Sequence, residues 1–303
     1  MARSTRSGAP AVATQEDWAQ VGVSCPDFVK QALQKGEENY RELPWRNVDD
    51  PYAVLVSEVM LQQTQVTRVQ KYWPRFLAAF PTIDALAAAS TADVLSFWQG
   101  LGYNRRALAL KRCAEECSAR YGGELPATVE ELEQLPGIGP ATAAGVTAFA
   151  CNLPSCYIET NVRSVFLHDL FPDHEKVPDR VLEPFVRSAT DYALSFVTPR
   201  VWYYALLDYG AYIKANTVNP SRRSAHYARQ SSFEGSHRQK RSILLKMVLA
   251  APEGVSSVDA FSALCDFESS HKRPSVSEEE FESLVNELLT EGFFRQEGPL
   301  LMP

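Results

Sequence analysis

A turn rich in glycine and proline, set between two helical patterns, constrains the fold of this 303-residue chain most strongly. Residues 136–140 read PGIGP, with helical patterns over Glu130–Leu135 before them and Ala141–Ala150 after them. Gly137 and Gly139 allow the backbone to come close to another molecule, and the second helix presents unpaired N–H groups at its start. Such a turn predicts a cradle for an anion, well suited to a DNA phosphate. A turn that merely joins two helices is the alternative interpretation.

Two glutamates stand at positions that favour chemistry. Glu159 lies close to Asn161, where a new helix (Val162–Leu170) is predicted to begin. Glu58 interrupts an apolar helical pattern over residues 52–66, so desolvation is expected to raise its pKa and make it a general acid at neutral pH. A glutamate that simply faces solvent is the alternative for this position.

The net charge of −7 argues mildly against nucleic acid as a partner, but the charge is segregated along the chain. Residues 214–241 carry seven basic side chains against one acidic side chain, a local net of +6, and a second basic run spans residues 105–112. Residues 252–303 carry eleven acidic and three basic side chains, a local net of −8. A DNA footprint on the central part of the chain is therefore allowed. The acidic C-terminal region is better suited to packing or to contact with another protein.

The cysteines and the N-terminus point to an ordinary soluble protein. Six cysteines form no CxxC pair and no compact cluster, which favours buried or idle thiols over a metal site. No apolar stretch is long enough to span a membrane. Residues 1–20 are expected to form a flexible tail, and the first fifteen lack the apolar core of a signal peptide. The sequence therefore predicts a cytoplasmic protein without a metal, associated with the nucleoid if it is bacterial.

Helical periodicity extends along most of the chain and predicts an all-α fold. Before the basic segment, further helices are expected over residues 27–41, 50–61, 66–80, 82–88, 91–99, 104–121, 128–135, 178–196 and 202–213. The aromatic side chains of the last of these are expected to pack in the core. After the basic segment, helices are expected over residues 238–249, 257–265 and 277–290, followed by a terminal hairpin. This order outlines a winged-helix-like domain over residues 237–303.

Several separate motifs together resemble one family of DNA repair enzymes. They are PWR at 44–46, DPY at 50–52, SEVMLQQT at 57–64, GLGY at 100–103, LPGIGPATA at 135–143, ETNVRSV at 159–165 and LDYGA at 207–211. These motifs resemble those of the helix-hairpin-helix (HhH-GPD) base-excision DNA glycosylases, and in particular the MutY-type A/G-specific adenine glycosylases. The resemblance implies a two-lobed helix-hairpin-helix glycosylase fold with a C-terminal winged-helix-like α+β appendage. Residues 21–50 and 162–236 would form one helical lobe, and residues 51–161 a six-helix lobe with the hairpin.

The resemblance also implies roles for individual residues. Glu58 would protonate the leaving adenine, Glu159 would stabilise the sugar cation, and Asn161 would orient nearby groups. Gln63 and Tyr103 would enter the DNA stack when the nucleotide is extruded. The full set expected to bind DNA is Gln62, Gln63, Thr64, Tyr103, Arg105, Gly137, Gly139, Thr142, Arg222 and Arg223.

The chain also departs from the family pattern. Ala141 occupies the position of the lysine that forms a Schiff base in bifunctional relatives, which predicts a monofunctional hydrolase. Lys214 stands where the first of four cluster cysteines is expected, and no cysteine lies between Cys156 and Cys265, so no iron–sulfur cluster is predicted. Glu159 replaces the usual aspartate, which adds about 1.5 Å of reach. The C-terminal region shows no resemblance to the domain with which adenine glycosylases sense 8-oxoguanine.

Three hypotheses follow from these patterns. The first is a monofunctional DNA glycosylase that hydrolyses the N-glycosidic bond of a flipped-out adenine mispaired with guanine or 8-oxoguanine. The second keeps the scaffold but removes thymine or uracil from a mismatch; Glu58 favours adenine, because loss of a purine benefits from protonation. The third is a catalytically weak lesion-binding protein. In each case the expected partner is double-stranded DNA with a mismatch or an oxidised base, bound by a monomer that needs no cofactor.

Overall fold

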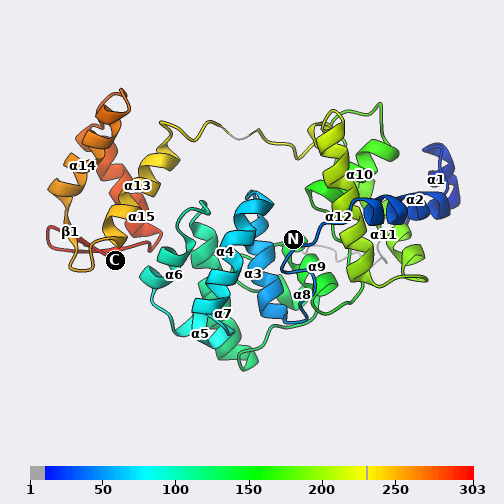
Figure 1. The fold of residues 1–303 in the computed structure, drawn as a ribbon, viewed down its shortest axis with the longest axis horizontal. Coiled ribbons are helices and arrows are strands. Elements are labelled where there is room, and N and C mark those ends of the chain that lie inside the picture. Colours follow the sequence, from blue (N-terminus) through cyan, green and yellow to red (C-terminus); the bar gives the residue numbers. More distant parts are fainter. Residues whose placement is uncertain (1–10, 230) are drawn as a thin grey trace, which may run out of the picture. The chain divides into compact units, whose positions relative to one another are not determined.

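The computed structural model describes residues 11–229 and 231–303 and confirms a mostly helical chain with a small C-terminal sheet (Figure 1). Within this part of the chain, no helix is both long and apolar enough to cross a membrane. The chain divides into two compact units. Unit 1 comprises Met1–Val54, Ala127–Glu133 and Gly139–Arg229, and unit 2 comprises Leu55–Pro126, Gln134–Ile138 and Gln230–Pro303. Each unit is thus assembled from segments that are distant in the sequence.

Unit 1 is built around the long helix α12. Its elements are α1 (Gln15–Gln20), α2 (Cys25–Glu38), α8 (Val129–Leu132), α9 (Pro140–Phe149), α10 (Thr160–Asp169), α11 (Asp179–Ala193), α12 (Pro199–Asn216) and the 3₁₀ helix η1 (Pro220–Arg223). Helix α12 packs against both α2 and α10 (Figure 1). Trp202 and Tyr203 on α12 are fully buried, as expected for core aromatics, whereas Tyr212 is exposed. The apolar face of α12 therefore forms the centre of the unit 1 core.

Helix α1 lies within the stretch that was expected to form a flexible N-terminal tail. Thr14 caps this helix by accepting from the Asp17 N–H, and Asp17 accepts in return from the Thr14 N–H, which completes a capping box. Trp18 is buried, and its Nε1 donates to Ser188 Oγ on α11 over 3.0 Å. The prediction of a flexible tail to residue 20 is wrong for residues 14–20, because one buried tryptophan anchors a short helix that shows no apolar periodicity. Residues 1–10 of the expected tail lie outside the described residues.

A buried ion pair joins two of the sequence motifs inside unit 1. The Asp208 carboxylate accepts two bonds from the Arg46 guanidinium, at 2.6 and 2.7 Å. Each side chain is only 1% exposed. Arg41 Nε adds a third bond to Asp208, at 2.6 Å. Because a charge withdrawn from water is costly unless it is paired, this pair ties the loop of residues 39–50 to α12.

Unit 2 carries the loops of Gln62, Gln63 and Tyr103, which are predicted to contact DNA. Its first part contains α4 (Val66–Ala79), α5 (Ile83–Ala88), α6 (Thr91–Trp98), α7 (Arg105–Tyr121) and most of α3 (Pro51–Leu61), which begins in unit 1. Helix α7 packs against α5 and α6, and α4 packs against α6. The Phe76 and Trp98 rings meet edge to face, with their centroids 5.6 Å apart. These contacts hold the two ends of the α6–α7 connection in a rigid frame.

The C-terminal part of unit 2 has the expected winged-helix-like order. Helices α13 (His237–Leu249), α14 (Ser257–Ser270) and α15 (Glu278–Thr290) precede the hairpin of β2 (Arg295–Glu297) and β3 (Leu300–Met302). The sequence did not reveal a further strand, β1 (Val255–Ser256), which pairs antiparallel with β3 and gives the sheet order β1-β3-β2. Two residues are too few to show the alternation by which a strand is recognised.

Candidate active site

Glu159 caps the N-terminus of α10. Its backbone is extended, and its Oε1 accepts from the N–H groups of Asn161 and Val162, at 2.5 and 3.2 Å. These bonds satisfy two of the donors that a helix start leaves open. Gly210 on α12 packs closely against this helix start, since a Cβ at that position would lie 2.2 Å from the Asn161 carbonyl oxygen. The glycine of the LDYGA motif is therefore required by close packing against the end of α10 that carries the carboxylate.

Opposing influences set the pKa of Glu159. Burial raises it above the usual value, and the N–H bonds from Asn161 and Val162 and the charges of Lys214 and Arg163 only partly offset that rise. The helix start alone would favour the ionised form. Desolvation outweighs this effect of the helix start, so the carboxyl group of Glu159 holds its proton more tightly here than in water.

Two cations belong to the surroundings of this carboxylate. Lys214 Nζ, on α12, donates to Asn161 Oδ1 over 3.1 Å. Arg163, the arginine that sits one place early in the ETNVRSV motif, forms a bidentate pair with Asp179 on α11, with both bonds at 2.7 Å. Sequence reasoning assigned a role to neither side chain. Both contacts join residues far apart in the chain, which no local pattern reveals.

Glu58 lies in α3 among buried neighbours. Ser57 and Val59 on either side are 1% and 4% exposed, whereas Glu58 itself is only partly buried. This placement agrees with a carboxyl group at the border of an apolar wall. A raised pKa for Glu58 stays a prediction. Glu58 belongs to unit 2 and Glu159 to unit 1.

Arg106 organises the loops of unit 2 and was missed from the sequence. Its Nη1 donates to the carbonyl groups of Val59, Met60 and Gln62 at 2.6–3.0 Å. Its Nη2 donates to Thr64 Oγ1 at 3.0 Å and to the Gly102 carbonyl at 2.9 Å. Burial lowers the pKa of Arg106 to about 10, so the guanidinium is still charged at neutral pH. One side chain thus joins the end of the Glu58 helix to the loop that carries Tyr103.

The backbone of these loops is strained at the two residues predicted to enter DNA. Gln63 has a φ of 56° and Tyr103 a φ of 50°, in the left-handed region that side chains other than glycine rarely adopt. Gly100 and Gly102 beside Tyr103 also have positive φ. Such strain persists where the surroundings impose it, and it clusters at functional sites. The observation therefore supports a special role for both loops.

We expect Arg106→Ala to loosen both loops. Several carbonyl groups would lose their donor, which should lower the free energy of unfolding by about 2–4 kcal/mol. Urea unfolding and limited proteolysis within residues 61–65 and 99–104 measure the effect. Arg112→Ala is the matched control, because Arg112 is exposed on the same helix and carries the same charge. Equal stability and equal protease resistance of the two variants would refute the organising role of Arg106.

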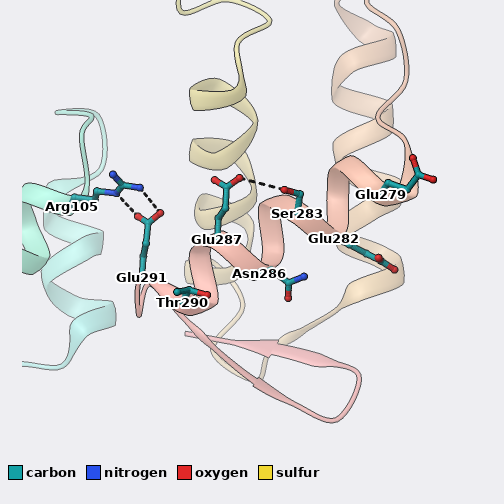
Figure 2. A pocket seen from close by; sticks show the side chains of 8 residues that line it. All are labelled: Arg105, Glu279, Glu282, Ser283, Asn286, Glu287, Thr290 and Glu291. Carbon is teal, nitrogen blue, oxygen red and sulfur yellow. Dashed lines mark hydrogen bonds and ion pairs between the residues drawn. The ribbon is translucent and has the colours of Figure 1, made fainter.

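Side chains of the C-terminal part contact two residues of the expected DNA-binding set within unit 2. Arg105 forms a bidentate pair with Glu291, at 2.6 and 2.7 Å, in a shallow hollow beside α15 (Figure 2). Arg238 Nη1 donates to the Tyr103 hydroxyl over 3.0 Å. Arg241 also pairs with Glu291. Contact of Tyr103 and Arg105 with DNA stays a prediction, and it requires these bonds to be exchanged.

The hairpin turn has the expected local geometry. Gly137 has a φ of 76°, and a Cβ there would lie 2.5 Å from the Ala109 Cβ, so both conformation and space require glycine. Gly139 caps α9, and the space where a Cβ would stand is open to 4 Å. Thr142 is only 7% exposed and offers little surface to DNA. Binding of an anion at this turn stays a prediction.

The two neighbouring arginines of the basic segment after α12, Arg222 and Arg223, have different surroundings. Arg222 is exposed, as a DNA contact requires. Arg223 instead donates to the carbonyl groups of Leu167, Phe171 and Pro172 at the end of α10. The Leu167 carbonyl is one of the acceptors that a helix end leaves open, and the other two belong to the loop that follows α10. Arg223 therefore has a capping role that the sequence did not reveal. A DNA contact of Arg223 stays a prediction.

The donor set does not fit the iron–sulfur cluster that the family resemblance implies. Four cysteine thiolates are needed, and the six cysteines of this chain include none between Cys156 and Cys265. Lys214, at the first expected cysteine position, donates to Asn161 instead. In residues 11–229 and 231–303, no group of three or more His, Cys, Asp or Glu side chains could hold a metal ion.

Comparison with known proteins identifies a family and individual proteins to which the chain is similar. Residues 56–205 match the family described as HhH-GPD superfamily base excision DNA repair protein. An adenine DNA glycosylase of Mycobacterium tuberculosis is 44% identical over 130 residues, which are 43% of each chain. A thymine-DNA glycosylase of Aeropyrum pernix is 37% identical over 123 residues, covering 40% of this chain and 55% of that protein. A solved structure of a thermostable thymine-DNA glycosylase has a TM-score of 0.54 at 23% identity, covering 63% of this chain and 88% of that one.

Residues 56–205 of the chain belong to the HhH-GPD superfamily of base-excision DNA repair proteins. Its sequence is similar to those of adenine DNA glycosylases, including those of Mycobacterium tuberculosis and Homo sapiens. The structural match confirms the helix-hairpin-helix glycosylase fold. The matched region spans less than half the length of the mycobacterial adenine glycosylase.

Proposed function

We propose that the protein is a monofunctional DNA glycosylase that hydrolyses the N-glycosidic bond of adenine mispaired with guanine or 8-oxoguanine. The observation that carries the proposal is the Glu159 carboxylate at the start of α10, held by two backbone N–H groups within a superfamily match that covers residues 56–205. A partly buried carboxylate is suited to stabilising a nearby cation, because water screens it less than at the surface. The similarity to adenine DNA glycosylases supports adenine as the base.

The proposed reaction divides its chemistry between two carboxyl groups. Glu58 donates a proton to the departing adenine, which makes the purine a better leaving group. Glu159, ionised, stabilises the positive charge that develops on the deoxyribose as the bond breaks. Water then adds to the sugar carbon and loses a proton. Ala141 offers no amine at the position of the family's Schiff-base lysine, so the product is an abasic site rather than a cut strand.

The target adenine must leave the helix before either group can act. Unstacking and unpairing a nucleotide costs a few kcal/mol, which contacts in the vacated space offset. Gln63 and Tyr103, held in strained conformations on loops joined by Arg106, are suited to fill that space. The start of α9 at Gly139, where the space beside the missing side chain is free, is suited to a phosphate. The exposed Arg222 provides a further phosphate contact, and the protein acts as a monomer on double-stranded DNA without a cofactor.

One observation favours a second candidate function. The supporting observation is the similarity, at 37% identity, to a protein named thymine-DNA glycosylase. Thymine or uracil removal from a mismatch therefore remains the alternative on the same scaffold. Glu58 favours adenine, since protonation assists purine loss more directly.

Single-turnover cleavage with alkali treatment distinguishes these functions. Duplexes of otherwise identical sequence carry A:8-oxoguanine, A:G, T:G, U:G or A:T as the test pair. We expect cleavage at the adenine strand of the first two and none at A:T. Cleavage of the T:G and U:G duplexes alone would establish the alternative function. Tight binding without cleavage of any duplex would show a lesion-binding protein.

A further inference from the structure

We propose that Lys214 is a positioning residue, which from α12 holds the Asn161 side chain and places a positive charge beside the Glu159 carboxylate. This inference rests on the proposed glycosylase function. Its geometric basis is the bond of 3.1 Å from Lys214 Nζ to Asn161 Oδ1. Asn161 is also the residue whose backbone N–H binds Glu159. Lys214 therefore acts on the site through the same residue that positions the carboxylate.

The face of α12 that carries Lys214 contacts Asn161 twice. Gly210 and Lys214 are four residues apart, which places them on one side of the helix. The missing side chain of Gly210 admits the Asn161 backbone, since a Cβ would lie 2.2 Å from its carbonyl oxygen. Lys214, one turn later, reaches the Asn161 side chain. The two contacts together fix both the backbone and the amide of Asn161.

An ammonium group determines which way this amide faces. Lysine offers three donors and no acceptor, so it can bind only the oxygen of the Asn161 amide. The amide NH₂ then faces away from Lys214 and can donate to another group. A neutral residue with both donor and acceptor atoms at position 214 would accept either orientation. The charge of Lys214 thus gives Asn161 a defined direction.

Lys214 also differs from the other charges around α10. Arg163 shares its charge with Asp179 of α11, through two bonds of 2.7 Å. Lys214 donates to a neutral amide, so its charge is available to act on Glu159. His168 and Asp169 belong to the last turn of α10, at its far end, where Arg223 of η1 donates to the Leu167 carbonyl. Arg222, the other charged residue of η1, is exposed to solvent. Lys214 is therefore the cation best placed to favour the charged form of the carboxylate.

The first test compares Lys214→Met, Lys214→Arg and the control Lys30→Met, which removes a charge from an exposed position on α2. Single-turnover rates and DNA dissociation constants are measured with the full chain on the A:8-oxoguanine duplex. We expect Lys214→Met to slow the reaction by about tenfold to a hundredfold. Its dissociation constant for DNA should match that of Lys30→Met. In its pH–rate profile, the fall of the rate at low pH should move to higher pH. Lys214→Arg should restore most of the rate.

Three results would overturn the proposal. An unchanged single-turnover rate in Lys214→Met would show that Lys214 does not position Asn161 or Glu159. Weaker DNA binding at an unchanged rate shows a phosphate contact instead. Equal losses of single-turnover rate in Lys214→Met and Lys214→Arg would show that the positive charge at position 214 does not determine the rate.

A second measurement is independent of activity. Urea unfolding midpoints are compared for Lys214→Met in the wild-type background and in the Glu159→Gln background. At neutral pH we expect Lys214→Met to lower the urea midpoint more when Glu159 is present than when glutamine replaces it. Only an ionised carboxylate is stabilised by the charge of Lys214. The difference should vanish near pH 4.5, the usual carboxyl pKa. Equal midpoint shifts in both backgrounds would contradict the role of Lys214, even if the wild-type protein cleaves no duplex and the proposed function itself fails.

Discussion

Glu159→Gln is expected to abolish base release while making the folded protein more stable at neutral pH. Loss of the charge that stabilises the sugar cation should slow the single-turnover reaction by at least about a hundredfold. The stability gain follows from the pKa of Glu159, which burial raises in the folded protein. The folded state therefore binds the proton more tightly than the unfolded chain. Ionising the carboxyl group at neutral pH costs folding free energy that glutamine does not.

The pH dependence of this stability difference has a definite sign. The favourable contribution of protonated Glu159 is fully present below its unfolded pKa, near 4.5, and is lost as the pH rises through the folded-state pKa. Glu159→Gln should thus melt above the wild type at neutral pH, by about 2–4 °C for each kcal/mol recovered. The two proteins should converge as the pH approaches 4.5. A melting temperature below that of the wild type at neutral pH would show that ionised Glu159 stabilises the fold.

Asp208→Ala is expected to destabilise unit 1 far more than the loss of an exposed charge would. It would leave the Arg46 guanidinium, 1% exposed, without its carboxylate. Removal of one partner from a buried pair costs about 3–5 kcal/mol, since the remaining charge stays withdrawn from water. Urea unfolding measures the loss.

Two comparisons isolate the buried charge at this position. Asp173→Ala, at an exposed loop position, is the matched control and should change stability by less than about 0.5 kcal/mol. Replacing both partners, with Arg46→Met and Asp208→Leu, should recover part of the stability, because no fully buried charge remains unpaired; Arg41, which also binds Asp208, is partly exposed to water. A loss for Asp208→Ala no larger than the control's would show that Arg46 finds other partners.

The helical fold could be predicted because its signals are local. Apolar periodicity, caps and turn glycines lie within a few residues of one another, and the helices follow them closely. The position of Glu159 at a helix start was predicted for the same reason. Helix α1 and strand β1 were not, because each is short and owes its order to contacts with distant segments.

The parts of the site that were missed depend on distant partners. Arg106 and Arg223 act through backbone carbonyl groups, and every residue carries such a group, so no motif marks them. The role proposed for Lys214 depends on the approach of α12 to α10. The sequence showed only that a lysine replaces an expected cysteine. The positive φ values of Gln63 and Tyr103 were equally hidden, since neither residue type favours that conformation.

The most direct test of the central claim is the detection of free adenine by chromatography and mass spectrometry. The wild-type protein and its Glu58→Gln and Glu159→Gln variants are incubated with the A:8-oxoguanine duplex under single-turnover conditions. We predict that the wild type releases one adenine per duplex and leaves an intact abasic strand, and that both variants bind the duplex and release almost none. Wild-type rates of adenine release in either variant would contradict the assignment of catalysis to these two carboxyl groups.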